Sequence, residues 1–454
     1  MALRMMIWLL FACVGAHVLT AAETAAIFVL IGDQHSAYAR TAQFVAHVDR
    51  LKAANPETPL AVLIDGDSFE LGNVVARRSE GAIDVAMFAA LAHRAPTILN
   101  LGNHEPEFSD VATTVTRVSA TSVTVIGNVR DRTSGELFAP ASIHLRLGTT
   151  DVVVAGVTTD ILAQYRAAVR PTLDLAAPAD WAREEFPGLL SAAPIKIVMS
   201  HAGLRLDRGM FPFVPDGTLF VGAHDHARFA ERIGSTLYVH SGSWNSHFSV
   251  VRLSVTNGLP TWSVEQVPIR DSDPADPALA ALIAETTRHH LNGDDLKAVG
   301  ASATEKSRTE AAEFVVNAVR MAADADAAFI GNTTFGDGLP AGEVTRVALD
   351  NCVRFDGTIW VAEISGERLR RLIAEANQGP DTPFPERQGE FHYASGPTDI
   401  VDQRTYRIAT NDWGVKNRER YFGPPEIQFE ERAGLRLKAL TAAALATPPS
   451  EPKK

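Results

Sequence analysis

The order of apolar and polar segments constrains the fold of this chain more than any other feature. Short apolar runs such as AAIFVLIGD (25–33), PLAVLIDGD (59–67) and PTILNLGNH (96–104) have the length of buried strands, and segments with helical spacing lie between them. Each of these runs finishes in an acid, an amide or an imidazole. Strands that alternate with helices predict an α/β fold, in which functional side chains gather beyond the carboxyl ends of the strands.

Four further strand-like runs follow in the middle of the chain. They are TDVVVAGVTT (150–159), PIKIVMSH (194–201), GTLFVGAHDH (217–226) and STLYVHSGSW (235–244). A chain of 454 residues is too long for one ordinary core, so two or three domains are expected. The segment VPIRDSDPADPAL, residues 267–279, has the proline and aspartate density of a linker.

A second unit with its own helices is predicted beyond this linker. Residues 309–324 and 364–376 have helical spacing, and Ser365 is placed to cap the second of these helices. The end of the chain, LATPPSEPKK, has the composition of a disordered tail. The predicted division is a signal peptide at 1–22, a first domain at 23–266, a linker at 267–279, a second domain at 280–435 and a disordered tail at 436–454.

The N-terminal stretch MALRMMIWLLFACVGAHVLTAAETA has the order of a secretory signal, because one arginine precedes an apolar core and then small residues. A membrane span fits less well, since Gly15 and His17 interrupt the apolar run, and lipidation at Cys13 ranks second. With the signal removed, Cys352 is the only cysteine and no internal disulfide can form. We expect a periplasmic or secreted protein without an integral membrane segment after cleavage.

The charge of the chain limits its partners. A formal net charge of −12 argues against a nucleic-acid polymer, because binding to a phosphate backbone needs a basic surface. Small anionic substrates remain compatible with this charge, since bound metal ions can hold them.

Metal-binding residue types cluster at the predicted strand ends. Imidazole, carboxylate and amide donors without cysteine suit divalent ions such as Mn²⁺, Zn²⁺, Fe²⁺ or Co²⁺. In an extended chain His224 and His226 point to one side, and Asp225 between them points away. The candidate donors are Asp33, His35, Asp67 with its neighbour Asp65, Asn103, His201, His224 and His226.

The order of the motifs DxH, GD, GNHE, SHAG and HxH resembles that of the calcineurin-like metallophosphoesterases, and more narrowly the secreted 5′-nucleotidase and UDP-sugar hydrolase family. The second unit also resembles the C-terminal domain of that family, through LPAGEVT, FDGT, ISGERL and ATNDW. The resemblance implies a four-layered αββα domain followed by a smaller α+β substrate-binding domain.

The resemblance also implies a pair of divalent metal ions. One ion would be held by Asp33, His35, Asp67 and His226, and the other by Asp67, Asn103, His201 and His224, with Asp67 bridging the two. A hydroxide shared by the ions would attack the phosphorus of a phosphoric ester. His104 would act on the phosphoryl group or the leaving oxygen, and Glu107 would orient it in place of the family's usual aspartate.

In the family, the C-terminal domain stacks the ring of the substrate between two aromatic side chains. The matching segments here give Phe391 and Tyr421, with Phe422 as the neighbour of the second, and a nucleotide is the expected substrate. The family's NGGGIR loop is replaced by GNTTFG, so that Gly336 stands at the place of its arginine. Arg418 and Arg420 are candidates to restore the missing positive charge.

Three functions compete on this basis. The leading one is a dimetal hydrolase that releases phosphate from nucleoside phosphates or a related phosphorylated small molecule. A thiosulfohydrolase would keep the metal ions and cleave another bond. A non-catalytic binding module derived from the family ranks last, because every inferred metal ligand is present.

Overall fold

The structure is a computed structural model that describes residues 24–446. The expected signal peptide and the last residues of the tail lie outside this range. In the first domain, one six-stranded sheet has the order β14-β13-β1-β2-β3-β4, in which β1 to β4 are parallel neighbours and β13 is antiparallel to β1. Its strands are β1 (Thr24–Gly32), β2 (Leu60–Asp65), β3 (Thr97–Asn100), β4 (Thr124–Ile126), β13 (His247–Thr256) and β14 (Leu259–Pro268).

A second six-stranded sheet has the order β11-β12-β10-β9-β7-β6, with β7, β9, β10 and β12 parallel. Its strands are β6 (Ser142–Leu147), β7 (Thr150–Thr158), β9 (Ile195–His201), β10 (Leu219–Gly222), β11 (Arg228–Ile233) and β12 (Thr236–Ser241). The short strands β5 (Arg130–Asp131) and β8 (Leu173–Asp174) pair with each other outside the two sheets.

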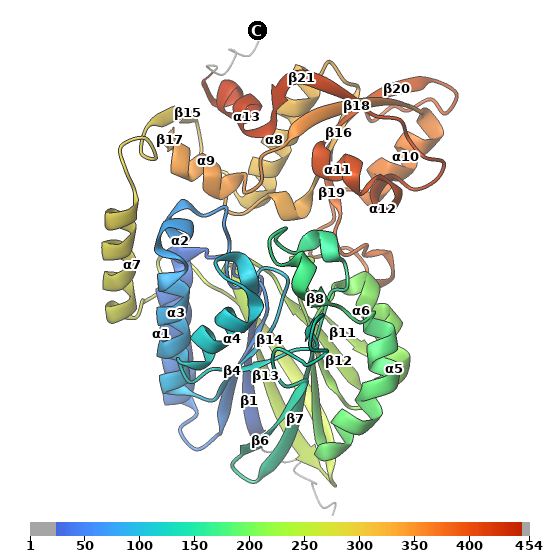
Figure 1. Cartoon of the computed structure of the whole chain (residues 1–454). Coiled ribbons are helices and arrows are strands. Elements are labelled where there is room, and N and C mark those ends of the chain that lie inside the picture. Colours follow the sequence, from blue (N-terminus) through green and yellow to red (C-terminus); the bar gives the residue numbers. More distant parts are fainter. Residues whose placement is uncertain (1–23, 447–454) are drawn as a thin grey trace, which may run out of the picture.

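Helices cover the outer face of each sheet (Figure 1). The helices on the side of the first sheet are α1 (Thr41–Ala54), α2 (Val74–Ser79), α3 (Ala82–Arg94), α4 (Val111–Ser119) and α7 (Pro277–His290). The second sheet is covered by α5 (Pro178–Leu189) and α6 (Leu204–Met210). Helix, sheet, sheet and helix follow one another, which is the four-layered order expected from the sequence.

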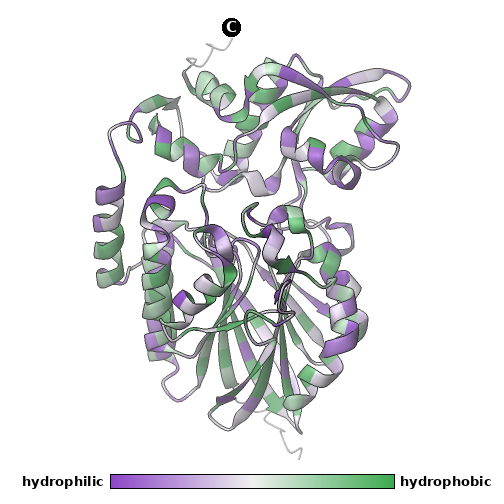
Figure 2. Ribbon diagram, in the orientation of Figure 1, coloured by the Kyte–Doolittle hydropathy of each residue, from purple (hydrophilic) through white to green (hydrophobic). Residues whose placement is uncertain are grey.

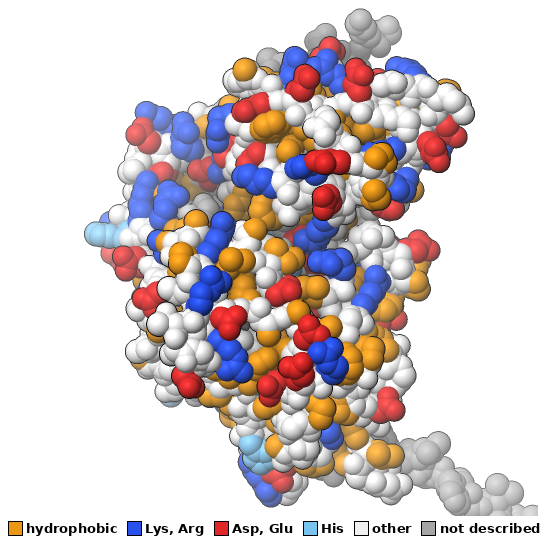
Figure 3. Space-filling view, turned by 45° about the vertical axis from the view of Figure 1, so that its right-hand side comes forward, with side chains coloured by type: hydrophobic (Ala, Val, Ile, Leu, Met, Phe, Trp, Pro, Cys, Tyr) orange, Lys and Arg blue, Asp and Glu red, His pale blue; other side chains and the backbone are white. Residues whose placement is uncertain are grey.

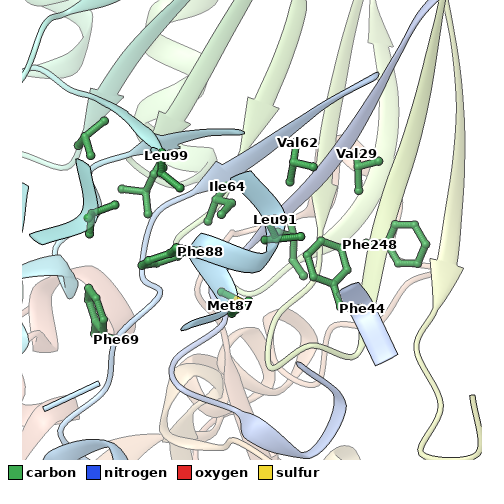
Figure 4. Packing of buried hydrophobic residues seen from close by; sticks show 14 of the residues in the cluster. Val29, Phe44, Val62, Ile64, Phe69, Met87, Phe88, Leu91, Leu99 and Phe248 are labelled. Carbon is green, nitrogen blue, oxygen red and sulfur yellow. The ribbon is translucent and has the colours of Figure 1, made fainter. Parts of the chain in front are cut away.

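Alternation along the strands explains why the two sheets face each other. In β1, Val29 joins the core beneath α1 and α3, whereas Phe28 points into the core between the sheets. Figure 4 shows Val29 and Val62 packed near Phe44 and Leu91, and Figure 2 shows the strands as mainly hydrophobic. Strands buried on both faces need near-continuous apolar runs, which is the pattern in this sequence.

The second domain has a five-stranded sheet in the order β19-β16-β20-β18-β21. Its strands are β16 (Ala327–Gly331), β18 (Thr358–Ser365), β19 (His392–Ser395), β20 (Thr405–Asn411) and β21 (Glu430–Arg436), and β15 (Ala298–Ser302) pairs with β17 (Gly342–Thr345) beside it. Helices α8 (Arg308–Ala322), α9 (Arg346–Cys352) and α13 (Leu437–Ala446) contribute to one core of this domain, whereas α10 (Gly366–Glu375) and α12 (Arg418–Phe422) contribute to a second, with the short helix α11 (Asp412–Lys416) beside it.

Two local expectations about the second domain have different outcomes. The Ser365 hydroxyl accepts a hydrogen bond from the backbone N–H of Arg368, so it caps α10 as predicted. The prediction of a disordered tail from residue 436 is wrong for residues 437–446, which form α13. This helix buries Leu437 and Leu445 against the core beneath α8. No helix of residues 24–446 is long and apolar enough to cross a membrane.

Candidate metal centre

The polar strand ends of both sheets meet at one edge of the first domain. Asp33 follows β1 directly, and Asp67 and Asn103 come shortly after β2 and β3. From the other sheet, His201 is the last residue of β9 and His224 follows β10. Carboxyl ends of parallel strands lie at one edge of a sheet, and Figure 1 shows this edge facing the second domain.

Left-handed turns aim these side chains. His224 and His226 were expected to point together because the chain is extended, but β10 ends at Gly222 and both histidines have positive φ, 79° and 58°. Asp33, His35 and Asp67 also have φ near 50°. Non-glycine residues adopt this region at a cost of order 1–3 kcal/mol each, and such strain clusters at functional sites.

One group of donors consists of Asp33, His35 and His226. The Nε2 atoms of His35 and His226 lie 2.9 Å apart, and Oδ1 of Asp33 lies 3.9 Å from Nε2 of His35. Both oxygens of Asp33 also accept the backbone N–H of His224, at 3.0 and 2.9 Å. Two ring nitrogens and a carboxylate that converge in this way offer ligands to one cation.

A second group consists of Asp67, His201 and His224. Nδ1 of His201 lies 2.7 Å from the carbonyl oxygen of Asp65, so this nitrogen carries the proton and Nε2 is left as a free donor for a metal. Nε2 of His201 lies 3.0 Å from Oδ2 of Asp67. Oδ1 of Asn103 is buried without a hydrogen-bond partner among residues 24–446, while its Nδ2 donates to the carbonyl oxygen of Gln164.

Asp67 stands between the two groups. Its Oδ2 lies 3.9 Å from Nε2 of His35 and 3.0 Å from Nε2 of His201. Glu105, which the sequence reasoning did not single out, holds the turn that presents it: its carboxylate accepts the backbone N–H groups of Asp67 and Gly102 at 2.9 and 2.7 Å. The structure thus places all seven predicted ligands in one buried cluster.

The electrostatics of the cluster favour neutral imidazoles. Burial lowers the pKa of His35, and it lowers the pKa values of His224 and His226 well below their usual range. Unprotonated imidazole is the form that binds a metal ion. Several buried atoms, including Oδ1 of Asn103 and Nε2 of His224, have no hydrogen-bond partner among the described residues, so the donor set fits a pair of divalent ions.

His104 lies beside the cluster and is held by carboxylates. Its Nδ1 lies 2.8 Å from Oε1 of Glu107, as the carried-over pair predicts, and its backbone N–H donates to Oδ1 of Asp67. Burial alone would lower the pKa of His104, but the carboxylates of Asp67, Glu107 and Glu70 raise it well above the usual value. His104 is therefore protonated in this environment and can act as a donor.

Sequence reasoning missed Glu70, although it ends the quoted motif IDGDSFE. Its Oε2 lies 3.4 Å from Nδ1 of His35 and 4.0 Å from Nδ1 of His104. Burial opposes ionisation of this carboxyl, but His35, His104 and Arg354 lower its pKa to about 2. A carboxylate on the outer nitrogen of a ligating histidine orients the ring and raises its basicity.

The second domain also reaches the centre. The guanidinium of Arg354 donates to the carbonyl oxygen of His35 at 3.2 Å and lies 4.7 Å from the ring centroid of Trp244, which stacks on the His35 ring. Oε1 of Glu390 lies 3.6 Å from Nε2 of His224. These contacts join residues far apart in the sequence, so no local signal could have found them.

A cavity of about 500 Å³ opens in front of the metal-binding residues. Phe355 and Trp413 of the second domain line it, together with Tyr165 of the first. The predicted ring contacts Phe391 and Tyr421 do not line this cavity. Tyr421 donates its hydroxyl to Glu390, and the ring of Phe391 packs edge-on against Tyr393 with centroids 5.2 Å apart. The cavity therefore takes its aromatic walls from other residues than those expected.

The predicted replacement of the lost arginine also differs in the structure. A Cβ atom at Gly336 would lie 2.4 Å from the carbonyl oxygen of Asn351 and 2.9 Å from Cδ of Arg354. A larger side chain has no room there, because Arg354 occupies the neighbouring space. The carboxylates of Glu426 and Glu390 pair with Arg418 and Arg420, so neither candidate cation is free.

Comparison with known families and structures agrees with this architecture. The calcineurin-like phosphoesterase model matches residues 27–228, and the 5′-nucleotidase C-terminal domain model matches residues 283–423. No curated protein sequence matches the chain.

Solved structures resemble the whole chain at low sequence identity. A 5′-nucleotidase precursor from Thermus thermophilus has a TM-score of 0.64 and 15% identity over 93% of this chain and 96% of that one. The sulfate thiohydrolase SoxB of the same species has a TM-score of 0.68 and 14% identity over 94% and 95%. A 5′-nucleotidase from Candida albicans has 0.61 and 13% over 93% and 98%. At these identities the likeness shows the fold alone.

Proposed function

We propose that this chain, which belongs to the calcineurin-like phosphoesterases and carries the C-terminal domain of the 5′-nucleotidases, releases phosphate from nucleoside phosphates or related small phosphorylated molecules. The observation that carries the proposal is the pair of donor groups that share the carboxylate of Asp67. A carboxylate with one group on each side is the arrangement that a two-metal hydrolase needs.

The proposed ligands divide between two ions. Asp33, His35 and His226 would hold one ion, Asn103, His201 and His224 the other, and Asp67 both. Two divalent ions held in this way supply positive charge to the phosphoryl oxygens and lower the pKa of a water molecule. Mn²⁺, Zn²⁺, Fe²⁺ and Co²⁺ all accept such donors.

His104 would handle a proton of the reaction. Glu107 engages its Nδ1, so Nε2 is the nitrogen that remains for the substrate, and His104 lines the cavity. A protonated ring here donates to the phosphoryl group or to the leaving oxygen, and Glu107 keeps the ring in the required tautomer and orientation. A positioned acid of this kind contributes about 10²–10⁴-fold to the rate.

The leaving group would occupy the outer part of the cavity. Trp413 and Phe355 offer aromatic faces against which a nucleobase can stack, and stacking accepts every base. Figure 3 shows acidic and basic side chains interspersed on the face in view, without a continuous basic track. Together with the net charge of −12, this favours a small substrate over a nucleic-acid polymer.

A thiosulfohydrolase is the second candidate. The observation that favours it is Gly336, since the position of the substrate-binding arginine is closed by Asn351 and Arg354. The metal-binding residues would be the same, and only the bond cleaved would differ. Export to the periplasm or the exterior is part of the same proposal and is supported by the sequence of residues 1–22.

The test compares two single variants of the purified protein. Asp67→Asn should lose bound metal and phosphate release together, because one carboxylate serves both ions. His104→Asn should retain two metal ions per chain and lose about 10²–10⁴-fold in kcat. Elemental analysis gives the metal content, and phosphate release from AMP and p-nitrophenyl phosphate gives the rates.

The outcomes separate the alternatives. Fewer than two ions per chain at saturating metal, with activity intact, would contradict the dimetal site. Loss of metal in His104→Asn would make His104 a ligand. Turnover of thiosulfate-derived substrates without phosphate release would select the second candidate.

A further inference from the structure

A second and smaller cavity lies between the two domains, next to His226. Its volume is about 140 Å³, and its walls come from residues 204–228 of the first domain and 308–393 of the second. Arg228, Arg308 and Arg387 line it, and no aspartate or glutamate does. Three cations that converge on one small space without an acid are unusual in a chain whose net charge is −12.

None of the three arginines forms an ion pair within residues 24–446. Arg308 donates to the hydroxyl of Ser243 at 2.8 Å and to the carbonyl oxygen of Asn332 at 3.1 Å. Arg387 donates to the carbonyl oxygen of Pro380, and Arg228 lies 2.7 Å from Nε2 of His247. All these partners are neutral acceptors, so the three positive charges are uncompensated at close range.

Buried donors remain free in the same place. The Nε atoms of Arg308 and Arg387 are buried and have no acceptor among the described residues, and the Arg387 side chain belongs to a residue that is only 7% exposed. Nδ1 of His226, whose Nε2 faces His35, is also buried without a partner in that range. Buried charged groups are costly unless they are paired, which points to a missing anion.

The remaining wall residues suit an oxyanion. Thr309 and Tyr393 bring hydroxyl groups that lie 3.4 Å apart, and Gln378 brings an amide. Guanidinium forks match the oxygen geometry of phosphate and sulfate, and charge-assisted hydrogen bonds to such ions are stronger than neutral ones. The cavity has room for one such ion, since a water molecule occupies about 30 Å³ of liquid volume.

We propose that this interdomain cavity binds a small tetrahedral oxyanion, such as phosphate or sulfate, through Arg228 of the first domain and Arg308 and Arg387 of the second. The anion is either a free inorganic ion or a second anionic group of a substrate. This site is distinct from the proposed metal cluster, and its existence does not require hydrolytic activity.

The location of the bound anion is tested with crystals of the metal-loaded protein soaked in selenate. The expected result is a selenium anomalous peak between the three arginines, in addition to any peak at the metal cluster. A peak at the metal cluster alone would overturn the proposal and leave the proposed function standing.

Sulfate affinity, measured by calorimetry, tests the same site in solution. Arg387→Gln and Arg228→Gln should each weaken the binding by about ten-fold to a hundred-fold, the usual effect of losing hydrogen bonds to a charged group. The two variants belong to different domains, so a folding defect in one does not remove the test. Arg252→Gln is the matched control, since Arg252 of β13 has no ion pair among the described residues and lies outside the cavity.

Substrate kinetics separate the two sources of the anion. If the site takes a group of the substrate, Arg387→Gln raises KM for a nucleoside diphosphate more than KM for the monophosphate. If it takes a free ion, both KM values stay unchanged while sulfate binding weakens. Equal sulfate affinity in the parent and both cavity variants would overturn the proposal.

Discussion

Buried carboxylates of the first domain fall into two kinds at the residue scale. Asp67, Glu70 and Glu107 face histidine side chains, whereas Asp84 and Asp207 are surrounded by hydroxyl groups and the apolar core. A carboxylate that faces histidines keeps its charge. A carboxyl buried among hydroxyls has its pKa raised by the loss of hydration, and for Asp84 the value rises to about 7.

Asp84 gives a prediction about pH and stability. Its Oδ2 accepts hydrogen bonds from the hydroxyls of Tyr38 and Ser36 at 2.6 and 3.2 Å. Between the unfolded value of 3.8 and about 7, the folded protein holds this proton while the unfolded chain releases it, so the group lowers the free energy of unfolding as pH rises. Asp84→Asn removes this loss, and the variant should gain stability over the parent by about 1.4 kcal/mol per pH unit across that window.

Urea unfolding of both proteins between pH 4 and pH 8 measures this effect. The difference should level off above pH 7. Asp110→Asn is the control with the opposite sign, because backbone hydrogen bonds lower the pKa of Asp110 at the cap of α4. A difference between Asp84→Asn and the parent that does not change with pH would contradict the raised pKa.

At the scale of elements, short turns decide which side chains reach the cavity. Trp413 lies at the start of α11, directly after β20, and lines the cavity in front of the metal-binding residues. Phe391 stands just before β19, where its backbone is tied to Asn332 and its ring packs against the core of the second domain. The motif that suggested Phe391 and Tyr421 lacks information about which face of the loop meets the cavity.

Trp413→Ala should therefore raise KM for AMP by about ten-fold to a hundred-fold, because stacking on one base contributes about 1–3 kcal/mol. Hydrolysis of p-nitrophenyl phosphate should change much less, since the residues that would bind metal are untouched. Steady-state kinetics on both substrates measure this.

Phe391→Ala is the comparison variant, and it should lower the Tm while leaving KM nearly unchanged. A raised KM in Phe391→Ala together with a silent Trp413→Ala would restore the original assignment of the ring contacts.

At the scale of the whole molecule, the second domain holds part of the proposed metal site in place. Arg354 bonds the carbonyl oxygen of His35 and covers Trp244, which stacks on the His35 ring with centroids 4.6 Å apart. On another part of the interface, Arg208 of α6 donates to the carbonyl oxygen of Phe384. The two arginines make comparable contacts between the domains, but only Arg354 touches a proposed ligand.

This difference predicts the effect of two matched variants. Arg354→Ala should weaken metal binding by about 10–100-fold, the usual effect of removing an outer partner of a ligand, and should lower kcat. Arg208→Ala should leave the metal affinity unchanged. A cobalt titration followed by visible absorbance measures the affinity apart from activity. Equal losses in both variants would mean that Arg354 acts only through the general stability of the interface.

The layers of the first domain and the proposed ligand set could be predicted from the amino-acid sequence. Near-continuous apolar runs of strand length are buried on both faces, so they form sheets that pack against each other and against helices, and strands such as β1 and β2 carry Asp33 and Asp67 just past their ends. The pairing of His104 with Glu107 was also readable, because the two residues are three positions apart.

Contacts between distant segments depend on the tertiary structure. His35 and Arg354 are 319 positions apart, and the cavity of three arginines draws its walls from both domains. Left-handed turns at His224 and His226 likewise depend on surrounding contacts that hold a conformation the chain would not adopt alone. Local sequence patterns encode period and hydropathy, but the direction of a side chain at a domain interface follows from how two separately formed cores dock.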